Sequence, residues 1–390
     1  MFSYVDSYGT QIWFLLESGT SQIDLDIKDY DNNSLLEYTF EVVNKYNLKQ
    51  FPFTIYLEDL VPNMEYIVSV FVDGIFVKEM DLFTKRPHLD DMQFLLGSNQ
   101  GLPSTKIFNH MKDSKSDFMV WLGGHVSFSG DCVNAELSNV GDMLNSYISV
   151  RKRSALNEFM SSTPQIATWG SSDYGALSDS PWALKDSSHF VFDLFWPNSL
   201  KKTYNYTYFN YGTYQRYNYN DVDLFLLDSR TFVSDSTLYG DTQIDRLFQE
   251  IKNTGSTFTI IASPVPFIFD TDDSFSNYQK EFNYFLEKLS VAKIDGLMLL
   301  STSCIGEGQA DNKKVEQPFT KMHGYALNKR SYNKTNNIYE FNFPPLSSNT
   351  YSLINISGKQ GDRIFSFETY NEKGNLIYRK KLHQNDLKSN

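Results

Sequence analysis

Residues 117–123 read Asp-Phe-Met-Val-Trp-Leu-Gly, a short apolar run that ends in a glycine. Such a run is typical of a strand that is buried on both faces and leads into a loop. The chain contains three similar runs, at Phe94–Gly97, Asp223–Asp228 and Gly296–Leu300. Between them, apolar residues recur on one helical face, as at Ile244, Leu247, Phe248 and Ile251. This alternation of strands and helices predicts an α/β domain over residues 88–390.

Residues 1–86 follow a different pattern. Ile23–Ile27 alternates with period two, as a half-buried strand does, and Asp73-Gly74 predicts a tight hairpin turn. Residues 60–66, Leu-Val-Pro-Asn-Met-Glu-Tyr, resemble the corner of fibronectin type III domains, in which the tyrosine hydroxyl bonds back to the corner backbone. We therefore expect a fibronectin III/Ig-like β-sandwich, with Lys85-Arg86-Pro87 as the linker.

Composition excludes several classes of protein. The 390 residues include 35 basic and 47 acidic ones, a formal charge of −12, which disfavours binding to nucleic acid. No run of about 18 apolar residues occurs, so we expect no membrane-spanning segment. Two cysteines are too few for a scaffold held together by disulfides.

The order of motifs resembles the alkaline phosphatase D family of metallophosphatases. The resemblance rests on Ser162–Ala167 leading into Trp169, on Phe-Trp-Pro-Asn at 195–198, on Leu-Asp-Ser-Arg at 227–230, and on Gln243 near the start of the next helix. It spans nearly the whole chain. It implies an N-terminal β-sandwich, a four-layer α/β/β/α domain and a dinuclear metal centre that hydrolyses phosphate esters.

The ligand positions of that family are changed here. Where the family has metal ligands, this sequence has Asn99, Gly124, Gly170, Ser171, Ser172, Ser303 and Ile305. Metal-assisted hydrolysis needs carboxylate, imidazole or thiolate ligands to hold the ions that polarise the phosphoryl group and activate water. Glycine and isoleucine supply no ligand. We therefore expect no bound metal, no other cofactor and no phosphatase activity.

Four residues of the pocket that the resemblance implies have ionisable side chains. Asp173 is either a remnant ligand or a local cap of its loop, and the surrounding Gly and Ser residues favour the cap. His125 is either part of the old pocket or structural. Asp228 and Arg230 match the family and suit an internal ion pair of the scaffold. A serine-hydrolase elbow is excluded by spacing, because Tyr174 separates Asp173 from Gly175.

The sequence thus predicts a catalytically inactive phosphatase-like protein that binds a partner protein or fills a structural place in an assembly. The Tyr-rich residues 197–220 suit an interaction surface. The alternative is a phosphodiesterase or phosphomonoesterase with a reorganised metal site, and a third reading is a carbohydrate- or lipid-binding module that reuses the old cleft. The resemblance and composition favour an exported protein of a bacterial envelope whose signal peptide is absent from this chain. A cytoplasmic protein is the alternative.

The two cysteines leave two readings open. The resemblance places the loops that carry Cys132 and Cys304 at the same rim of the cleft. In an oxidising compartment they could form a disulfide worth about 4 kcal/mol. The other reading is two free thiols, which the geometric demands of a disulfide favour.

Overall fold

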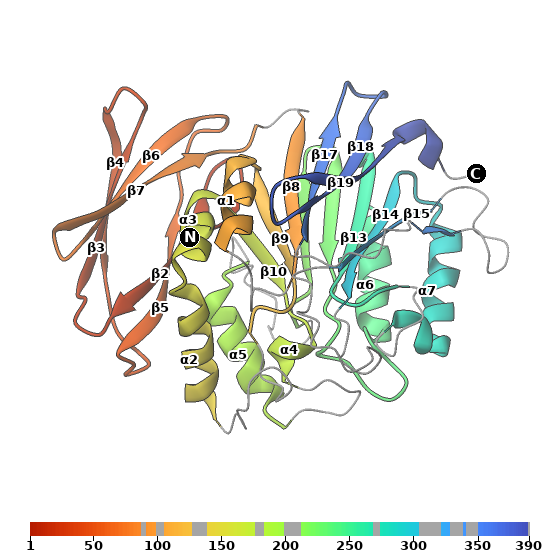
Figure 1. Ribbon diagram of the computed structural model, residues 1–390, viewed down its shortest axis with the longest axis horizontal. Helices are drawn as coiled ribbons and strands as arrows, with labels where there is room; N and C mark the ends of the chain where they lie inside the picture. Colours follow the sequence, from red (N-terminus) through yellow and green to blue (C-terminus); the bar gives the residue numbers. More distant parts are fainter. Residues whose placement is uncertain are drawn as a thin grey trace.

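The computed structural model describes residues 1–86, 91–98, 105–126, 139–175, 183–198, 212–267, 274–303, 321–327, 338–340 and 350–388. Figure 1 shows a β-sandwich at the left of the view beside a larger α/β domain. Among the described residues, no helix has the length and apolar character to cross a membrane. Several residues singled out in the sequence lie outside the described ranges: Asn99, Cys132, Cys304, Ile305 and residues 199–211.

The N-terminal sandwich contains two antiparallel sheets. One has the strand order β1–β2–β5, with β1 at Phe2–Val5, β2 at Thr10–Glu17 and β5 at Gln50–Leu57. The other has the order β4–β3–β6–β7, with β3 at Gln22–Lys28, β4 at Ser34–Glu41, β6 at Glu65–Val72 and β7 at Ile75–Phe83. Alternate residues of both sheets, such as Ile12, Ile23 and Val68, form one apolar core.

Two local predictions for the sandwich are confirmed. Asp73 and Gly74 join β6 to β7 with φ values of +49° and +77°, the left-handed conformation that tight hairpin turns require. The buried Tyr66 hydroxyl accepts a hydrogen bond from the main-chain N–H of Val61 at 2.7 Å. This bond ties the corner to the start of β6.

The α/β domain contains two six-stranded sheets. The first has the order β10–β9–β8–β17–β18–β19, with bounds Gln165–Thr168, Phe118–Leu122, Met92–Gly97, Thr350–Ser357, Ile364–Asn371 and Leu376–His383. The second has the order β11–β12–β13–β14–β15–β16, with bounds Gln215–Tyr219, Val222–Leu226, Phe258–Ser263, Leu297–Ser303, Lys321–Leu327 and Ile338–Glu340. Parallel pairing joins β10, β9 and β8, and likewise β12, β13 and β14.

The two sheets pack face to face beneath helices. Leu224 and Leu226 of β12 belong to the core between the sheets, whereas Phe225 belongs to the core beneath the helices. The helices near the first sheet are α1 (Thr105–Asp113), α2 (Val140–Arg151), α3 (Ser154–Ser162), α4 (Ser171–Tyr174) and α5 (Lys185–Phe195). Those on the second sheet are α6 (Asp241–Ile251) and α7 (Gln279–Ala292). Short 3₁₀ turns lie at Phe275–Asn277, before α7, and at Gln384–Leu387, after β19. The described elements therefore lie in the order helix, sheet, sheet, helix (Figure 1).

The C-terminal strands belong to the first sheet. β17 pairs antiparallel with β8, and β18 and β19 extend the sheet beyond it. Arg363, only 1% exposed in its side chain, lies 3.3 Å from an Asp91 oxygen and 3.1 Å from an Asp221 oxygen. The pairing of the buried Arg363 fixes the tail to two segments far away in the chain.

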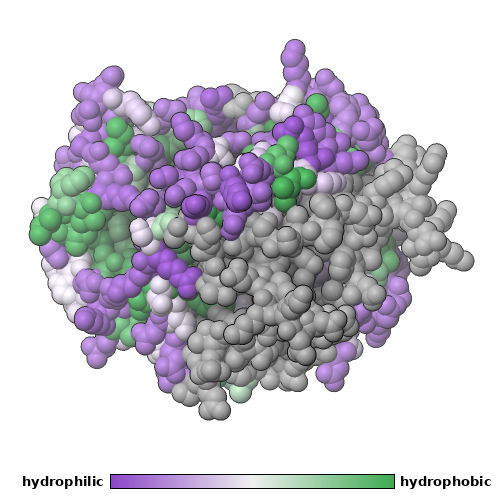
Figure 2. All heavy atoms as spheres, viewed as in Figure 1, coloured by the Kyte–Doolittle hydropathy of each residue, from purple (hydrophilic) through white to green (hydrophobic). Residues whose placement is uncertain are grey.

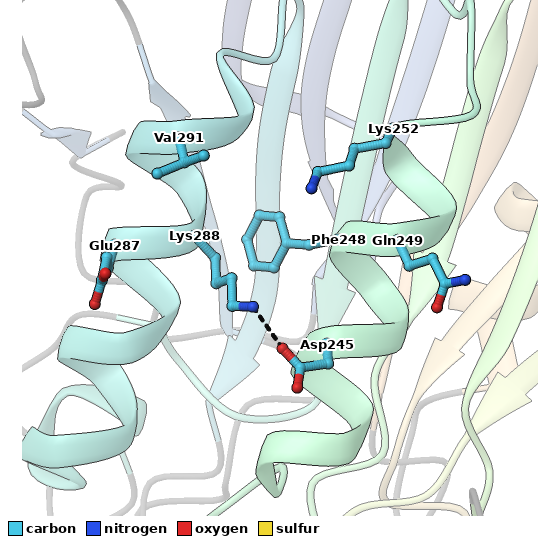
Figure 3. A pocket seen from close by; sticks show the side chains of 7 residues that line it. All are labelled: Asp245, Phe248, Gln249, Lys252, Glu287, Lys288 and Val291. Carbon is cyan, nitrogen blue, oxygen red and sulfur yellow. Dashed lines mark ion pairs between the residues drawn. The ribbon is translucent and has the colours of Figure 1, made fainter.

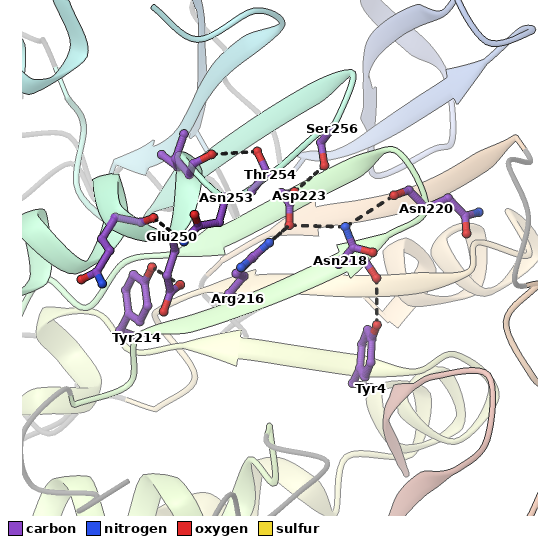
Figure 4. Close-up of polar contacts among 12 residues, drawn as sticks. Tyr4, Tyr214, Arg216, Asn218, Asn220, Asp223, Glu250, Asn253, Thr254 and Ser256 are labelled. Carbon is purple, nitrogen blue, oxygen red and sulfur yellow. Dashed lines mark hydrogen bonds and ion pairs between the residues drawn. The ribbon is translucent and has the colours of Figure 1, made fainter. Parts of the chain in front are cut away.

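The sandwich is joined to the α/β domain by aromatic residues. The Tyr4 ring packs against Tyr217 and Tyr219, and its hydroxyl donates to the Asn218 carbonyl at 3.1 Å (Figure 4). Trp13 of β2 donates from Nε1 to the Leu194 carbonyl of α5 at 2.8 Å. These contacts hold the sandwich beside the edge of both sheets.

Candidate functional site

The ends of four buried strands meet at one edge of the α/β domain. Thr302 of β14 donates to the carbonyl of Leu122, the last residue of β9, at 3.2 Å. Thr168, the last residue of β10, donates to the Leu227 carbonyl beyond β12 at 2.9 Å. Ligand sites in α/β proteins lie at such carboxyl ends of strands. This edge is therefore the candidate site.

The side chain of Asp173 is bonded to main-chain groups on every side. Its Oδ2 accepts from the N–H groups of Gly124 at 2.8 Å and Gly170 at 2.9 Å. Its Oδ1 accepts from His125 at 2.7 Å and Val126 at 3.0 Å. Asp173 is fully buried, so these charge-assisted bonds satisfy a carboxylate that water does not reach. We call this arrangement the Asp173 clamp.

Two glycines make the clamp possible. Gly123 and Gly124 both have φ values of +74°, which L side chains rarely adopt. A Cβ on Gly123 would lie 2.7 Å from the Cα and N atoms of Gly170, so the two loops approach too closely for any side chain there. Gly170, Ser171 and Ser172 lie at the start of α4, whose Asp173 reaches back to the first loop. The backbone thus occupies the middle of the site.

His125 points into an aromatic enclosure. Its ring centroid lies 4.5 Å from that of Trp196 and 5.8 Å from that of Phe192. Nε2 is 3.0 Å from the Thr168 carbonyl oxygen. A carbonyl only accepts, so Nε2 carries the hydrogen and donates a hydrogen bond to it. Burial lowers the pKa of His125, and the charge of Asp173 opposes this only in part. The imidazole is therefore neutral at pH 7.

Asp228 is also saturated with donors. Oδ1 accepts from Trp169 Nε1 at 2.8 Å and from the main-chain N–H groups of Arg230 and Thr231 at 2.7 and 2.9 Å. Oδ2 accepts from the Thr213 N–H and the Thr231 hydroxyl, both at 2.6 Å. The contact between Asp228 and Arg230 among these bonds is therefore a hydrogen bond from the Arg230 main-chain N–H.

Residues beyond the motifs support Asp228. Gln243 of α6 accepts from the Asp228 N–H and donates to the Asp228 carbonyl, each at 2.8 Å. A Cβ on Gly212 would lie 1.8 Å from the Asp228 Oδ2, and the φ of Gly212 is +57°. Sequence reasoning missed Gly212 and the partner residues of the clamp, because loops distant in the chain supply them.

The described residues of this edge offer few ligands for a dinuclear metal centre. The carboxylates of Asp173 and Asp228 are engaged by main-chain and side-chain donors, which leaves them poorly placed to coordinate ions. In the described ranges, no three or more His, Cys, Asp or Glu side chains group as a metal site. Ser303 ends β14 at the same edge, and a serine there adds no charge to hold cations.

A second hollow lies on the helical surface far from this edge. Asp245, Phe248 and Gln249 of α6, and Lys252 just beyond it, face Glu287, Lys288 and Val291 of α7 across a groove (Figure 3). Asp245 and Lys288 form an ion pair of 2.7 Å across it. The charges of this groove thus neutralise each other.

Comparison with known proteins supports the fold. No family model and no curated protein matches the sequence. A solved structure of PhoD matches with a TM-score of 0.72 at 12% identity, covering all of this chain and 93% of that one. A glycosyl hydrolase family 2 member from Bacteroides cellulosilyticus and a Parabacteroides merdae β-glucuronidase reach only 0.29 and 0.28 at 8% and 9% identity; they cover 98% and 94% of this chain and 62% and 66% of theirs. Scores this low carry no argument. The chain therefore has the fold of PhoD.

Proposed function

We propose that this protein is a phosphatase-like pseudoenzyme that serves as a binding or structural component of a protein assembly. The Asp173 clamp carries the proposal, because main-chain N–H groups take up the carboxylate that a metal would need. Gly124, at the position of a bridging aspartate, offers no side chain. We further propose that the sandwich is of the fibronectin type III kind, on the strand orders of its two sheets and the Tyr66 bond at its corner.

The sandwich also offers a surface for a partner. Figure 2 shows hydrophobic side chains gathered at the left of the view, over the sandwich. Ile75, Phe76 and Val77 at the start of β7 are 71%, 55% and 58% exposed. In the described part of the chain β7 pairs only with β6, so its other edge has main-chain groups available for another strand. An exposed apolar edge of this kind is typical of a protein–protein contact.

Metal binding and turnover test the loss of activity. The purified full chain is incubated with Ca²⁺, Fe³⁺, Mn²⁺ or Zn²⁺, and metal content and hydrolysis of aryl phosphomonoesters and diesters are measured. We expect no stoichiometric metal and no turnover above buffer. Turnover that disappears on chelation, or a stoichiometric metal centre, would establish the alternative of a reorganised phosphatase.

The partner surface is tested with two matched variants in the native host. Ile75→Lys places a charge on the exposed start of β7, whereas Val291→Lys does the same on α7, where the side chain is 69% exposed. We expect proteins that co-purify with the wild type to be lost with Ile75→Lys and kept with Val291→Lys. Retention by both variants would exclude this edge as the partner site. Fractionation of the same cells tests the proposed envelope location.

A further inference from the structure

A cavity of about 230 Å³ lies between the sandwich and helices α2 and α3. Strands β2, β6 and β7 line it with apolar side chains that include Leu16, Val72 and Met80, and α3 adds Met160. Of the described residues that line it, the polar ones include Arg151, Lys78 and Asn157, and none is acidic. The excess of positive charge is local, in a chain whose formal charge is −12.

Among the residues that the structure describes, no carboxylate is paired with the buried cation of Arg151. Its side chain is stacked 4.1 Å from the Trp196 ring and 5.4 Å from the Trp13 ring, and the residue is only 3% exposed. Its terminal nitrogens donate to the Phe195 carbonyl at 2.9 Å and the Met160 sulfur at 2.7 Å. Throughout the described ranges no carboxylate pairs with it, and its Nε has no hydrogen-bond partner.

Burial without a counterion leaves the guanidinium in an unfavourable environment. Burial lowers the pKa of Arg151 to about 9, and the nearby Tyr147 opposes this shift only in part. The rings of Trp196 and Trp13 also lie close to the guanidinium. Lys78 adds a second cationic group at the same cavity, again without an ion pair in the described part of the chain. An anion that enters the cavity would therefore gain strong charge-assisted hydrogen bonds.

We propose that this cavity binds the carboxylate of a short- to medium-chain fatty acid, with the carboxylate near Arg151 and Lys78 and the alkyl chain among the apolar side chains of the sandwich. The volume is below the roughly 300–1,000 Å³ of sites for drug-sized ligands, which excludes a complete two-chain lipid. The apolar walls exclude a small hydrophilic anion as the preferred ligand. This site is separate from the strand-end edge and does not depend on the loss of the metals.

The test compares decanoate with decan-1-ol, which has the same chain length and no charge, by calorimetric titration of the full chain. We expect decanoate to bind at least about tenfold more tightly, the usual gain from a hydrogen bond to a charged group. Arg151→Met removes the cation but keeps apolar bulk, and should abolish this preference while decan-1-ol affinity stays unchanged. Lys78→Gln, at an exposed position, should reduce the preference without affecting folding.

A second pair of variants tests the location of the alkyl chain. Val77→Trp fills the cavity from β7 and should weaken both ligands about tenfold. Ile75→Trp, on the same strand but outside the cavity lining, should weaken neither. The proposal is overturned if the wild type binds decanoate no more tightly than decan-1-ol. It is equally overturned if the preference survives both Arg151→Met and Lys78→Gln, or if Val77→Trp and Ile75→Trp bind alike.

Discussion

Asp173→Asn is the most direct perturbation of the candidate site. The substitution keeps the size of the side chain but replaces one carboxylate oxygen by an NH₂ group. Four main-chain N–H groups point at the two oxygens of Asp173, from Gly124, His125, Val126 and Gly170. An asparagine oxygen can accept two of these bonds, so the other two donors would face a donor.

The cost follows from the number of donors left unsatisfied. A buried N–H group without a partner costs about 1–3 kcal/mol, so two of them amount to about 4 kcal/mol. Loss of the negative charge weakens the two remaining bonds as well, because hydrogen bonds to charged groups are the stronger ones. We therefore expect Asp173→Asn to lower the free energy of unfolding by about 4 kcal/mol, a large part of the stability of an ordinary domain.

Urea unfolding followed by tryptophan fluorescence measures this loss, with and without Mn²⁺ or Zn²⁺. Ser172→Ala, one residue away on α4, is the matched control and should change the free energy by less than about 0.5 kcal/mol. Neither metal should stabilise the wild type. A loss below about 1 kcal/mol, or a metal-dependent gain that Asp173→Asn removes, would refute the structural role and make Asp173 a ligand.

Four further predictions use the same unfolding measurement. Gly212→Ala places a Cβ 1.8 Å from a carboxylate oxygen and should cost more than about 2 kcal/mol, whereas Gly255→Ala, with open space around it, should cost less than about 1. Tyr66→Phe removes the acceptor of the corner N–H and should cost about 1–2 kcal/mol. Arg363→Met removes the cation that faces Asp221 and Asp91 and should cost about 2 kcal/mol, mainly through Asp221, because the Asp91 side chain is 68% exposed. Burial lowers the pKa of His125, so stability should fall as the pH drops below about 6.5, and His125→Gln should reduce that slope. An unchanged midpoint, or for His125 an unchanged slope, contradicts the corresponding prediction.

The strands of the α/β domain could be predicted because they are short apolar runs buried on both faces. Its helices could be predicted because their apolar residues recur on one face. The run at 118–122 became β9, and the helical face at 244–251 became α6 with all four of its apolar residues buried. The turn at Asp73-Gly74 was readable because few residue pairs tolerate two positive φ values in succession. Patterns of this kind are local, so the sequence contains them directly.

The contacts within the site could not be predicted in the same way. The expected replacement of the ligand positions rests on residue identity and on the resemblance, so it could be inferred from the sequence. Three of the four partners of Asp173, however, are main-chain groups 47 to 49 residues earlier in the chain. A main-chain donor does not depend on the type of its residue, so the sequence does not reveal it. The unpaired charge of Arg151 was equally hidden, because it depends on which side chains the sandwich brings to α2.

The clamp supplies contacts that hold the strand ends together. In a metal centre, cations would neutralise the carboxylates and hold the loops around them. Here the N–H groups of one loop and of the start of α4 meet the Asp173 carboxylate, and five donors meet Asp228. Close approach of Gly123 and Gly170 is compatible with these bonds, whereas a side chain on Gly123 would force the loops apart. Gly124→Asp would therefore strain the main chain, because the φ of Gly124 is +74°. Under the proposed function, the main-chain bonds of the clamp take the place of metal ligands, so the α/β domain would hold the sandwich for a partner without chemistry at this edge.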